Sequence, residues 1–419
     1  MDCCAVDKVS ALALQIAHKL SDHHAVTVRT VVESINAKSL GVLNGHPSNN
    51  VPASVAAKIG MNLHLRQHHP LNIIKTRIED YFTQSPALRE PRPQIEVHDS
   101  LAPVVTARDN FDSLLIPPSH VSRRATDTYY VDDKRVLRTH TSAHQVTLLR
   151  RGAPPRAFLV CGDVYRRDEV DRSHYPVFHQ MEGVRVFAPD ELPAGATAAE
   201  REALAVADLR AGLEGLACAL FGDVEMRWVD AYFPFTNPSF ELEIFFGGKW
   251  LEVLGCGAIE RDVMRAGGMD DATVGWAFGL GLERLAMVLF SIPDIRLFWS
   301  DDARFTSQFK AGAATTFKPY SKYPPCLKDV SFWVPGATAE IAHGFHDNDM
   351  YEAVREVAGD MVEEIALVDE FAHPKTGRVS KCFRLTYRSM DRSLTNKEVD
   401  ALQELVRQRL VDKLGVELR

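Results

Sequence analysis

The sequence predicts an α+β protein with a mostly antiparallel sheet, followed by a smaller domain of β-α-β-β-α-β order. From about residue 111 to residue 257 the apolar runs are short and bounded by Pro, Gly and Asp. This pattern is typical of antiparallel strands, and one long helical stretch near 198–219 is inserted among them. After residue 323 short apolar runs alternate with two helical stretches. We therefore expect two domains of different architecture.

Composition limits the possible classes of protein. The chain has 419 residues, 46% of them hydrophobic, and a net charge of −8, which argues against bulk electrostatic binding of nucleic acid. No apolar run approaches the roughly 20 residues that a membrane-spanning helix needs. The seven cysteines are scattered without a Cys-x-x-Cys pair, and several histidines are adjacent rather than four apart. Neither a disulfide framework nor a zinc site is indicated, and a reducing compartment is favoured.

The first 60 residues are expected to be an N-terminal extension. Residues 1–25 contain Asp2, Asp7 and Asp22, whereas transit peptides are poor in acidic residues, so no clear transit peptide is visible. Residues 41–53 are rich in Gly, Pro and Asn and predict a loop between a short helical region and the body. A helix then begins at His69-Pro70, because proline suits the first turn of a helix. Its apolar stripe consists of Leu71, Ile74, Ile78 and Phe82.

A charged hairpin is the most informative feature of the chain. Apolar residues 157–160 and 184–187 flank a loop that contains Arg166 and Arg167, which predicts a buried strand, a charged loop and a return strand. Gln180 and Glu182 are two apart on the return strand and would share one face. A surface hairpin with solvated charges is the alternative. It is weakened because an unpaired carboxylate inside an apolar run is costly.

A second polar feature lies in the segment Phe278-Gly279-Leu280-Gly281-Leu282-Glu283-Arg284. It matches neither Gly-x-Gly-x-x-Gly nor a Walker loop, and it leads directly into a helix. Glycines at a strand-to-helix junction allow a ligand to lie against the backbone. Arg284, in the first turn, needs an anionic partner. A nucleotide phosphate is one candidate, and a structural salt bridge, with Glu283 as the nearest carboxylate, is the alternative.

The C-terminal segment predicts strands at 327–334, 367–371, 379–387 and 415–418, and helices at 347–366 and 395–413. This order is that of a ferredoxin-like domain. In the third strand, inward and outward residues alternate: Phe383, Leu385 and Tyr387 inward, and Cys382, Arg384, Thr386 and Arg388 outward. Residues 373–397 contain seven Lys or Arg and one acidic residue. Such a face suits an RNA backbone, although a solvated outer sheet face is the alternative.

Together these segments resemble the class II aminoacyl-tRNA synthetases, and specifically the phenylalanyl-tRNA synthetase family in its single-chain organellar form. The charged hairpin at 162–183 resembles motif 2 of that class. His69-Pro70-Leu71, residues 137–142 and residues 278–287 resemble other family segments in the required order. The resemblance covers about 61–419. It implies a class II catalytic domain with flanking helices at 61–305, a linker at 306–322 and an anticodon-binding domain at 323–419.

The resemblance also implies roles for individual residues. Arg166 would bridge the α-phosphate and the amino-acid carboxylate, and Arg284 would hold the γ-phosphate. Nucleotide contacts are implied for His174 and Glu252, with Glu252 also placing Mg²⁺. Arg384 and Arg388 are implied as tRNA contacts. The phenylalanine site would be built from His140, Ser142, Gln180, Glu182, Phe233, Phe235, Ala277 and Gly279. Asp168 departs from the Glu that is frequent at its position, which puts its reach toward adenine or the tRNA end in doubt.

By this resemblance, the chain is an ATP-dependent ligase that joins L-phenylalanine to tRNA(Phe) through a phenylalanyl-adenylate. The partners would be tRNA(Phe), phenylalanine and ATP with Mg²⁺, and the enzyme would be a monomer that serves a mitochondrion or chloroplast. Two alternatives remain: a related ligase for a small acid such as biotin or lipoate, and a catalytically silent RNA-binding paralogue. The pair Phe233 and Phe235 argues against the first alternative. The presence of Arg166, Glu182 and Arg284 argues against the second.

Overall fold

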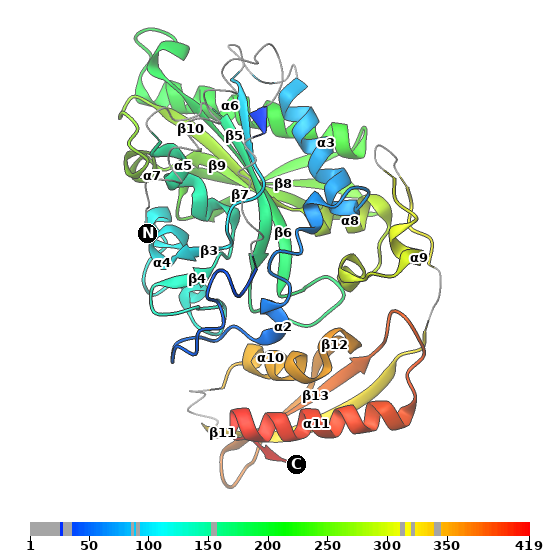
Figure 1. Cartoon of the computed structure of the whole chain (residues 1–419). Helices are drawn as coiled ribbons and strands as arrows, with labels where there is room; N and C mark the ends of the chain where they lie inside the picture. Colours follow the sequence, from blue (N-terminus) through cyan, green and yellow to red (C-terminus); the bar gives the residue numbers. More distant parts are fainter. Residues whose placement is uncertain are drawn as a thin grey trace.

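The computed structural model describes residues 26–27, 36–84, 88, 93–151, 157–310, 315–319, 323–338 and 345–419. Figure 1 shows a larger body above a smaller C-terminal domain, whose helix α10 (Asp347–Ala358) lies nearer to the body than α11 (Asn396–Leu414). The predicted N-terminal helical region lies outside the described residues. The glycine-rich segment that follows it contains turns and leads into α2 (Ala53–Ala56).

The body is built on one eight-stranded sheet. Its order is β1-β2-β5-β6-β10-β9-β8-β7, and every pairing except β1–β2 and β2–β5 is antiparallel. This confirms the predicted fold class. The strands, in sheet order, are β1 (Val26–Thr27), β2 (Ile95–His98), β5 (Ala157–Tyr165), β6 (Val177–Phe187), β10 (Val274–Gly281), β9 (Lys249–Ile259), β8 (Thr236–Phe246) and β7 (Met226–Phe233). A separate two-stranded sheet pairs β3 (Val104–Thr106) with β4 (Arg135–Leu137).

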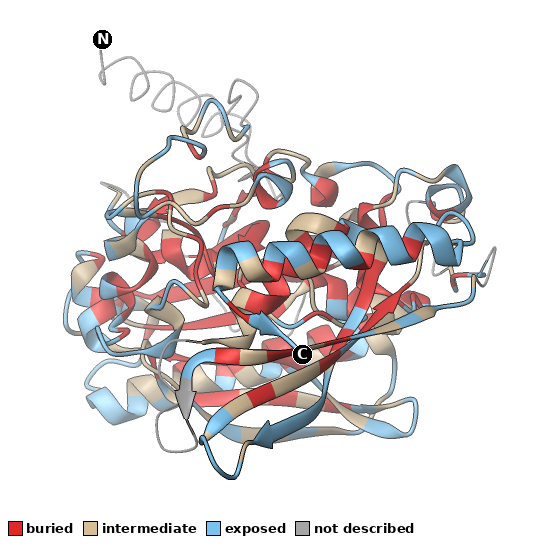
Figure 2. Cartoon of the chain, turned by 90° about the horizontal axis from the view of Figure 1, so that it is seen from below, coloured by how far each residue is buried: buried red, intermediate tan, exposed pale blue. Residues whose placement is uncertain are grey.

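Helices cover both faces of the large sheet. On β5, Ala157 and Leu159 point into the core shared with α3 (Pro70–Gln84), α6 (Ala198–Phe221) and α8 (Leu282–Phe290). Phe158 and Val160 point into the opposite core, which α4 (Ala107–Asn110), α5 (Gln145–Leu149) and α7 (Arg261–Ala266) help to build. This period of two means that β5 is buried on both faces. Figure 2 shows buried residues in the interior and exposed residues on the outer faces of helices.

The predicted local elements of the body are present. Helix α3 begins at Pro70 and buries its predicted apolar stripe, and the charged loop of the hairpin connects β5 to β6. The inserted helix α6 starts with a capping box in which Thr197 and Glu200 satisfy each other's backbone donors. Single 3₁₀ turns connect other elements: Leu63–Leu65, Asp112–Leu114, Val121–Arg123, Thr141–His144, Pro189–Glu191, Ile295–Trp299 and Gly359–Met361.

The C-terminal domain has the predicted β-α-β-β-α-β order. Its antiparallel sheet runs β12-β13-β11-β14. The strands are β11 (Cys326–Thr338), β12 (Val362–Ala372), β13 (Arg378–Tyr387) and β14 (Glu417–Leu418). Phe383, Leu385 and Tyr387 are buried as predicted. Thr386, predicted to face outward, is buried as well.

One predicted boundary in this domain is wrong. The helix expected to run to residue 366 ends at Ala358, and the strand begins at Val362. Gly359 adopts a positive φ of 53° at the C-cap, which glycine tolerates and other residues disfavour. Beyond it, an irregularity between Val362 and Glu364 puts Val362 and Ile365 on the same core face. In the sequence, two apolar residues three apart predict one face of a helix. Here they share a face because a β-bulge shifts the alternation of the strand.

The segment that joins the two domains packs partly on the body. It contains α9 (Ala303–Thr306), and Phe309 and Phe317 belong to the main core. The ring centroids of Phe305 and Phe317 are 5.7 Å apart, and the Phe317 amide donates to the Phe290 carbonyl. The predicted linker is therefore anchored to the body at least as far as Phe317.

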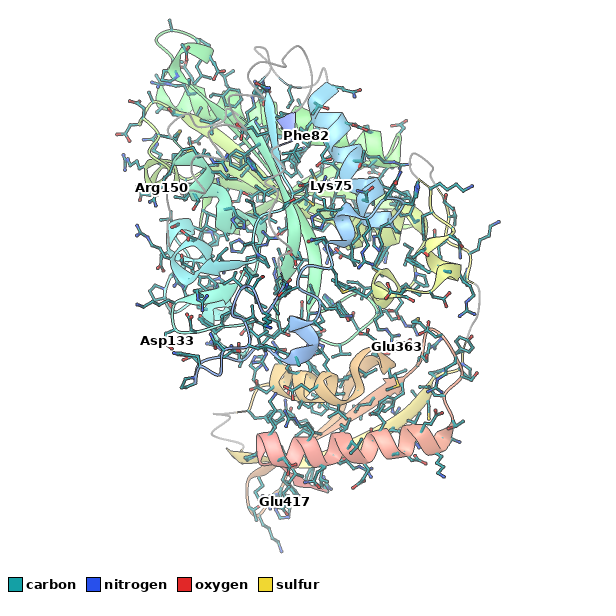
Figure 3. The ribbon with its side chains drawn as sticks, in the orientation of Figure 1. Lys75, Phe82, Asp133, Arg150, Glu363 and Glu417 are labelled. Atoms are coloured by element: carbon teal, nitrogen blue, oxygen red, sulfur yellow. The ribbon has the colours of Figure 1, made fainter. Side chains whose placement is uncertain are left out.

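Buried ion pairs join the C-terminal domain to the body. Glu363 is 1% exposed and lies at the junction (Figure 3), where it accepts from Arg172 Nε at 2.6 Å. Arg388 Nε lies 2.5 Å from the same carboxylate, and Arg296 lies 3.5 Å from it. A buried carboxylate without partners would be strongly destabilising, so the pairs of Glu363 with Arg172 and Arg296 of the body hold the two domains together, and Arg388 adds a partner from within the C-terminal domain.

Candidate active site

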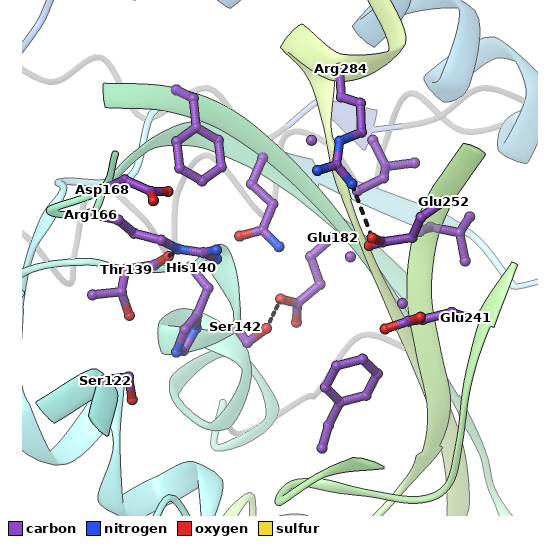
Figure 4. Close-up of a pocket in the computed structure, with 18 of the residues that line it drawn as sticks. Ser122, Thr139, His140, Ser142, Arg166, Asp168, Glu182, Glu241, Glu252 and Arg284 are labelled. Carbon is purple, nitrogen blue, oxygen red and sulfur yellow. Dashed lines mark hydrogen bonds and ion pairs between the residues drawn. The ribbon is translucent and has the colours of Figure 1, made fainter. Parts of the chain in front are cut away.

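A cavity of about 730 Å³ opens in the body where β6, β8, β9 and β10 meet the β5–β6 loop. The structure brings all the predicted catalytic and substrate-binding residues to its walls, although they come from positions 140 to 284. Figure 4 shows Arg166, Glu182, Glu252 and Arg284 around this space. The residues that line it from the predicted set are His140, Ser142, Arg166, His174, Gln180, Glu182, Phe233, Phe235, Glu252, Ala277, Gly279 and Arg284.

A buried carboxylate forms the polar centre of the cavity. Glu182 is 1% exposed, and its Oε2 accepts a short hydrogen bond from the Ser142 hydroxyl and a longer one from Thr141 Oγ1 at 3.4 Å. Burial raises the pKa of Glu182 to about 8, although the two hydroxyl donors oppose this shift. Its second oxygen, Oε1, has no hydrogen-bond partner among the described residues. A carboxylate oxygen without a hydrogen-bond partner in a polar recess suits a cationic ligand group such as an ammonium.

Two neighbours complete this polar centre. Gln180 Oε1 accepts from the Thr141 amide at 3.2 Å, which fixes the orientation of its amide. A Cβ on Gly279 would lie 2.9 Å from Gln180 Nε2, so the glycine leaves room for that side chain. Both ring nitrogens of His140 are buried, and burial next to the Arg166 guanidinium lowers the pKa of His140 to about 3. The imidazole is therefore neutral at physiological pH.

Arg166 is held rigidly at the edge of this centre. Its Nε donates to the Thr139 carbonyl at 2.8 Å, and the guanidinium lies 5.1 Å from the ring centroid of Phe178. The backbone below it is fixed by Arg138, which is 1% exposed and donates to Asp163 Oδ1 at 2.8 Å. A fixed guanidinium with free donors in a recess can bind carboxylate or phosphate oxygens in a bidentate way.

Arg284 and its acidic partners form another part of the cavity. Arg284 Nη1 donates to Glu252 Oε2 at 3.0 Å, and both side chains are about half exposed. The alternative pairing with Glu283 is wrong, because Glu283 is buried and bound to His179. Glu241 lines the same space, and its pKa is raised by burial and by the neighbouring carboxylates of Glu252 and Glu243.

An aromatic recess lies beside the polar centre. The rings of Phe233 and Phe235 stack at 6.1 Å between centroids with a 24° tilt, and Phe235 also stacks on His140 at 6.3 Å. A Cβ on Gly255 would lie 2.7 Å from the Phe233 ring, so only glycine permits this ring position. Ala277 is 5% exposed and lines the same cavity. The recess has the shape and polarity to hold an apolar side chain.

The loop between β5 and β6 connects the cavity to the C-terminal domain. His174 lines the cavity, and its Nδ1 bonds to Asp171 Oδ2 at 2.7 Å, a contact that raises the pKa of His174. Arg167 also borders the cavity, and its Nη2 donates to Asp349 Oδ1 of the C-terminal domain at 2.8 Å. Asp168 Oδ1 accepts from the Glu169 amide at 2.9 Å, so Asp168 shapes the loop.

The two predicted tRNA contacts lie away from the cavity. Arg384 is exposed on the outer face of β13 and forms two hydrogen bonds to Asp329, at 2.8 and 2.9 Å. Arg388, expected on the same outward face, lies beyond the end of β13 and pairs with the buried Glu363. That orientation was predicted wrongly, because the pair with Glu363 on the neighbouring strand β12 turns Arg388 toward the junction between the domains.

Sequence reasoning missed several residues of the site. Arg138, Thr141 and Glu241 orient or line the polar parts of the cavity, as described above. Glu241 could have been found from the alternation of apolar and acidic residues over 240–243. This alternation places the carboxylates of Glu241 and Glu243 on one face of a strand. The role of Arg138 had no such signal, because its partner Asp163 lies 25 residues away on another strand.

Comparisons with known proteins agree with this geometry. The family model described as "tRNA synthetases class II core domain (F)" matches residues 54–309, and "Ferredoxin-fold anticodon binding domain" matches residues 321–419. The chloroplastic/mitochondrial phenylalanine–tRNA ligase of Arabidopsis thaliana is 54% identical, over 89% of this chain and 83% of that protein. The mitochondrial enzyme of Mus musculus is 49% identical, over 88% and 86%. That of Saccharomyces cerevisiae is 39% identical, over 88% and 92%.

The sheet, the cavity and the core-domain match define a class II aminoacyl-tRNA synthetase, a class that uses ATP. None of the described helices is long and apolar enough to span a bilayer. At these identities and coverages the chain belongs to the phenylalanine–tRNA ligase family of mitochondria and chloroplasts. The predicted family is confirmed.

Proposed function

We propose that the cavity activates L-phenylalanine with ATP and then passes the phenylalanyl group to the 2′-hydroxyl of the terminal adenosine of tRNA(Phe). The observation that carries this proposal is Glu182. A buried carboxylate with one oxygen that has no hydrogen-bond partner among the described residues lies between an aromatic recess and a fixed guanidinium. An aromatic amino acid offers a ring, an ammonium and a carboxylate, which match these three features.

The amino acid would be held at both ends. Its ammonium would bind Glu182 and Gln180, with Ser142 and His140 completing the polar wall, and its ring would lie against Phe233 and Phe235. Aromatic rings favour offset or edge-to-face contacts with such a pair. Ala277 and Gly279 would close the recess.

The arginines would position the reacting groups. Arg166 would contact the amino-acid carboxylate and the α-phosphate together, so that the carboxylate oxygen is aligned for attack on the α-phosphorus while the bond to the β-phosphate breaks and pyrophosphate leaves. A donor that is already in place stabilises the charge that grows in the transition state without reorganisation. Arg284 would hold the γ-phosphate and His174 would contact the nucleotide. Binding of ATP would then replace the contact between Arg284 and Glu252.

The acidic side of the cavity fits a hard divalent cation. Glu252 and Glu241 direct carboxylates into the same space (Figure 4), and carboxylate oxygens together with phosphate oxygens suit Mg²⁺. When bound there, Mg²⁺ would neutralise phosphate charge. The protein's own contribution is to hold these carboxylates on paired strands, where Glu241 lies opposite Gly255 and Glu243 lies opposite Glu252.

The remaining assignments extend this proposal to the whole chain. The catalytic domain would span 61–305 and the anticodon-binding domain 323–419, with Arg384 on the outer sheet face as a tRNA contact. The match of residues 321–419 to an anticodon-binding model supports this division. The names of the relatives place them in mitochondria or chloroplasts, which supports a place in the matrix or stroma, and the enzyme would act there as a monomer.

Phenylalanine-dependent exchange of pyrophosphate into ATP tests the proposal directly. We expect exchange with phenylalanine and none with biotin or lipoate. An enzyme that binds tRNA(Phe) but exchanges no pyrophosphate would instead be a silent paralogue. Exchange that depends on a different acid would reject phenylalanine as the substrate.

A further inference from the structure

Tyr232 is an exposed aromatic residue at the rim of the cavity. Its side chain is 83% exposed, the largest fraction among the exposed large apolar side chains of the described residues, and it still borders the cavity. A ring in water contributes little to the stability of the fold. A residue of this kind next to a substrate cavity is therefore a candidate for binding a partner.

The backbone around Tyr232 directs the ring outward. In the β7–β8 hairpin, Ala231 pairs with Ser239 and Phe233 pairs with Thr236, so the register shifts at Tyr232. An irregularity of this kind changes the direction of a side chain and is frequent beside active sites. As a result, the Phe233 ring forms part of the cavity wall, and the Tyr232 ring projects into solvent at the rim.

The tip of this hairpin is held firmly. The hydroxyls of Thr236 and Ser239 lie 2.7 Å apart and are both buried, and Ser239 Oγ also contacts the Thr236 carbonyl at 2.7 Å. The Phe233 amide donates to Ser239 Oγ at 3.4 Å, and the Phe235 carbonyl accepts from the Glu260 amide at 3.0 Å. A ring on such a support is preorganised, which lowers the entropy lost on binding.

We propose that Tyr232 is the platform on which the terminal base of tRNA stacks during transfer of the phenylalanyl group. This rests on the proposed function, because it requires the tRNA end to enter this cavity. The amino acid and the triphosphate have binding groups inside the cavity, whereas Tyr232 faces out of it. Of the three proposed substrates only transfer RNA is too large to enter the cavity whole, so its end must pass the rim, and unpaired bases stack readily on aromatic side chains.

The experiment separates the two half-reactions in the full-length enzyme. We expect Tyr232→Ala to slow single-turnover transfer from enzyme-bound phenylalanyl-adenylate to tRNA(Phe) by at least about tenfold at subsaturating tRNA, a typical effect of losing one stacking contact. Pyrophosphate exchange should stay within about twofold of wild type. Tyr232→Phe should restore transfer, because the ring and not the hydroxyl provides the stacking face.

A binding cycle identifies the base. Dissociation constants are measured for wild type and Tyr232→Ala with intact tRNA(Phe) and with the same tRNA lacking its terminal adenosine. Removing the adenosine should weaken binding to wild type about tenfold and leave binding to the variant nearly unchanged. The matched control is Phe245→Ala, a 42% exposed aromatic on β8 that does not line this cavity, and it should behave as wild type in every assay.

Three results would overturn the proposal. If removing the adenosine weakened binding by the same factor in wild type and in Tyr232→Ala, Tyr232 would not contact the terminal base. Exchange that falls in parallel with transfer, with a raised KM for ATP, would assign the ring to the nucleotide. A Tyr232→Phe variant as slow as Tyr232→Ala would exclude stacking. The proposed function fails separately. It would be rejected if the wild-type enzyme showed no phenylalanine-dependent exchange, which is measured without any variant of Tyr232.

Discussion

Glu283 accepts two hydrogen bonds from His179, one from the backbone amide at 2.7 Å and one from ring Nδ1 at 2.7 Å. Both residues are buried. This pair fastens the first turn of α8 to β6, and it leaves the next residue, Arg284, to extend into the cavity toward Glu252. Two consecutive charged residues therefore have different surroundings: Glu283 is buried in a contact between elements, and Arg284 borders the cavity.

Glu283→Gln should weaken this attachment. The two carboxylate oxygens of Glu283 each accept one hydrogen bond from His179, whereas glutamine has a single acceptor oxygen. A hydrogen bond to a buried charge contributes about 1.5–3 kcal/mol. We expect a lower free energy of unfolding and a KM for ATP raised severalfold, with the KM for phenylalanine nearly unchanged. Glu417→Gln, which loses an exposed pair with Arg378 on the C-terminal domain, is the control and should change neither. A KM for ATP equal to that of wild type would show that the pair does not position Arg284.

Arg166→Ala should nearly abolish adenylate formation while the protein stays folded, because this side chain contacts the backbone of Thr139 and not the core. The measurement is pyrophosphate exchange, with circular dichroism as the check on folding. Arg150→Ala removes an exposed arginine on the outer surface (Figure 3) and should exchange normally. Exchange by Arg166→Ala within about tenfold of wild type, or 1.4 kcal/mol, would contradict the role.

Binding of phenylalanine should depend on pH through Glu182. Burial raises the pKa of this carboxyl to about 8, so it is protonated in the free enzyme at pH 7. An ammonium requires the carboxylate, so binding must release a proton. We expect affinity to improve by up to about tenfold per unit as the pH rises from 6 toward 8. Calorimetry in buffers of different ionisation enthalpy would detect the proton, and Glu182→Gln should bind weakly without this dependence.

The same pKa shift predicts the effect on stability. A carboxyl whose pKa is higher in the folded state stabilises the protein most below its ordinary pKa, and this contribution disappears as the pH rises to 8. Glu182→Gln has no such group. The free energy of unfolding of the variant, relative to wild type, should therefore increase between pH 5 and pH 8 in urea titrations. A constant difference would contradict the raised pKa.

Removal of the C-terminal domain should separate activation from charging. A cut near Thr315 would remove Phe317, which packs in the body, so the fragment should end at Lys318. We expect it to exchange pyrophosphate but to charge tRNA poorly, with a lower melting temperature because Tyr129 and Arg296 lose Glu352 and Asp360. Unchanged charging by the soluble fragment would exclude the anticodon-binding role.

Charge reversal tests the outer face of the sheet. Arg384→Glu breaks an exposed pair with Asp329, which contributes little to stability, and should weaken tRNA binding and reduce its salt dependence. Arg388→Glu would place a second carboxylate against the buried Glu363 and should mainly lower the melting temperature. Equal tRNA affinity and salt slope for Arg384→Glu and wild type would reject this contact.

Ala277→Gly should widen the recess. The change removes one methyl group, about 1 kcal/mol of packing, from a residue that is 5% exposed beside the cavity. An apolar pocket discriminates only moderately against an added hydroxyl. We expect para-chloro-phenylalanine and tyrosine to gain in kcat/KM relative to phenylalanine in pyrophosphate exchange. An unchanged ratio would show that Ala277 does not limit the pocket.

Local patterns were sufficient to predict much of this molecule from its sequence. The helix at Pro70, the β5–β6 hairpin and the inward side of β13 follow from spacings of two, three or four residues, which one element fixes by itself. The shared face of Gln180 and Glu182 follows in the same way, since alternation in a strand depends only on the backbone. Resemblance to a family then indicated which distant residues meet, and the structure brings all of those in the catalytic body to one cavity.

Only the tertiary structure decided which charges pair. Arg284 binds Glu252 and not its neighbour Glu283, because packing of α8 against β6 buries Glu283 beside His179. Arg388 leaves the outer face because Glu363, on a strand with a β-bulge, lies buried at the junction between the domains. A charged side chain can reach several partners that its sequence position does not distinguish. When one of these partners is a buried carboxylate, it has no water to bind. Any arrangement that leaves this carboxylate unpaired is therefore less stable than the one in which the side chain pairs with it.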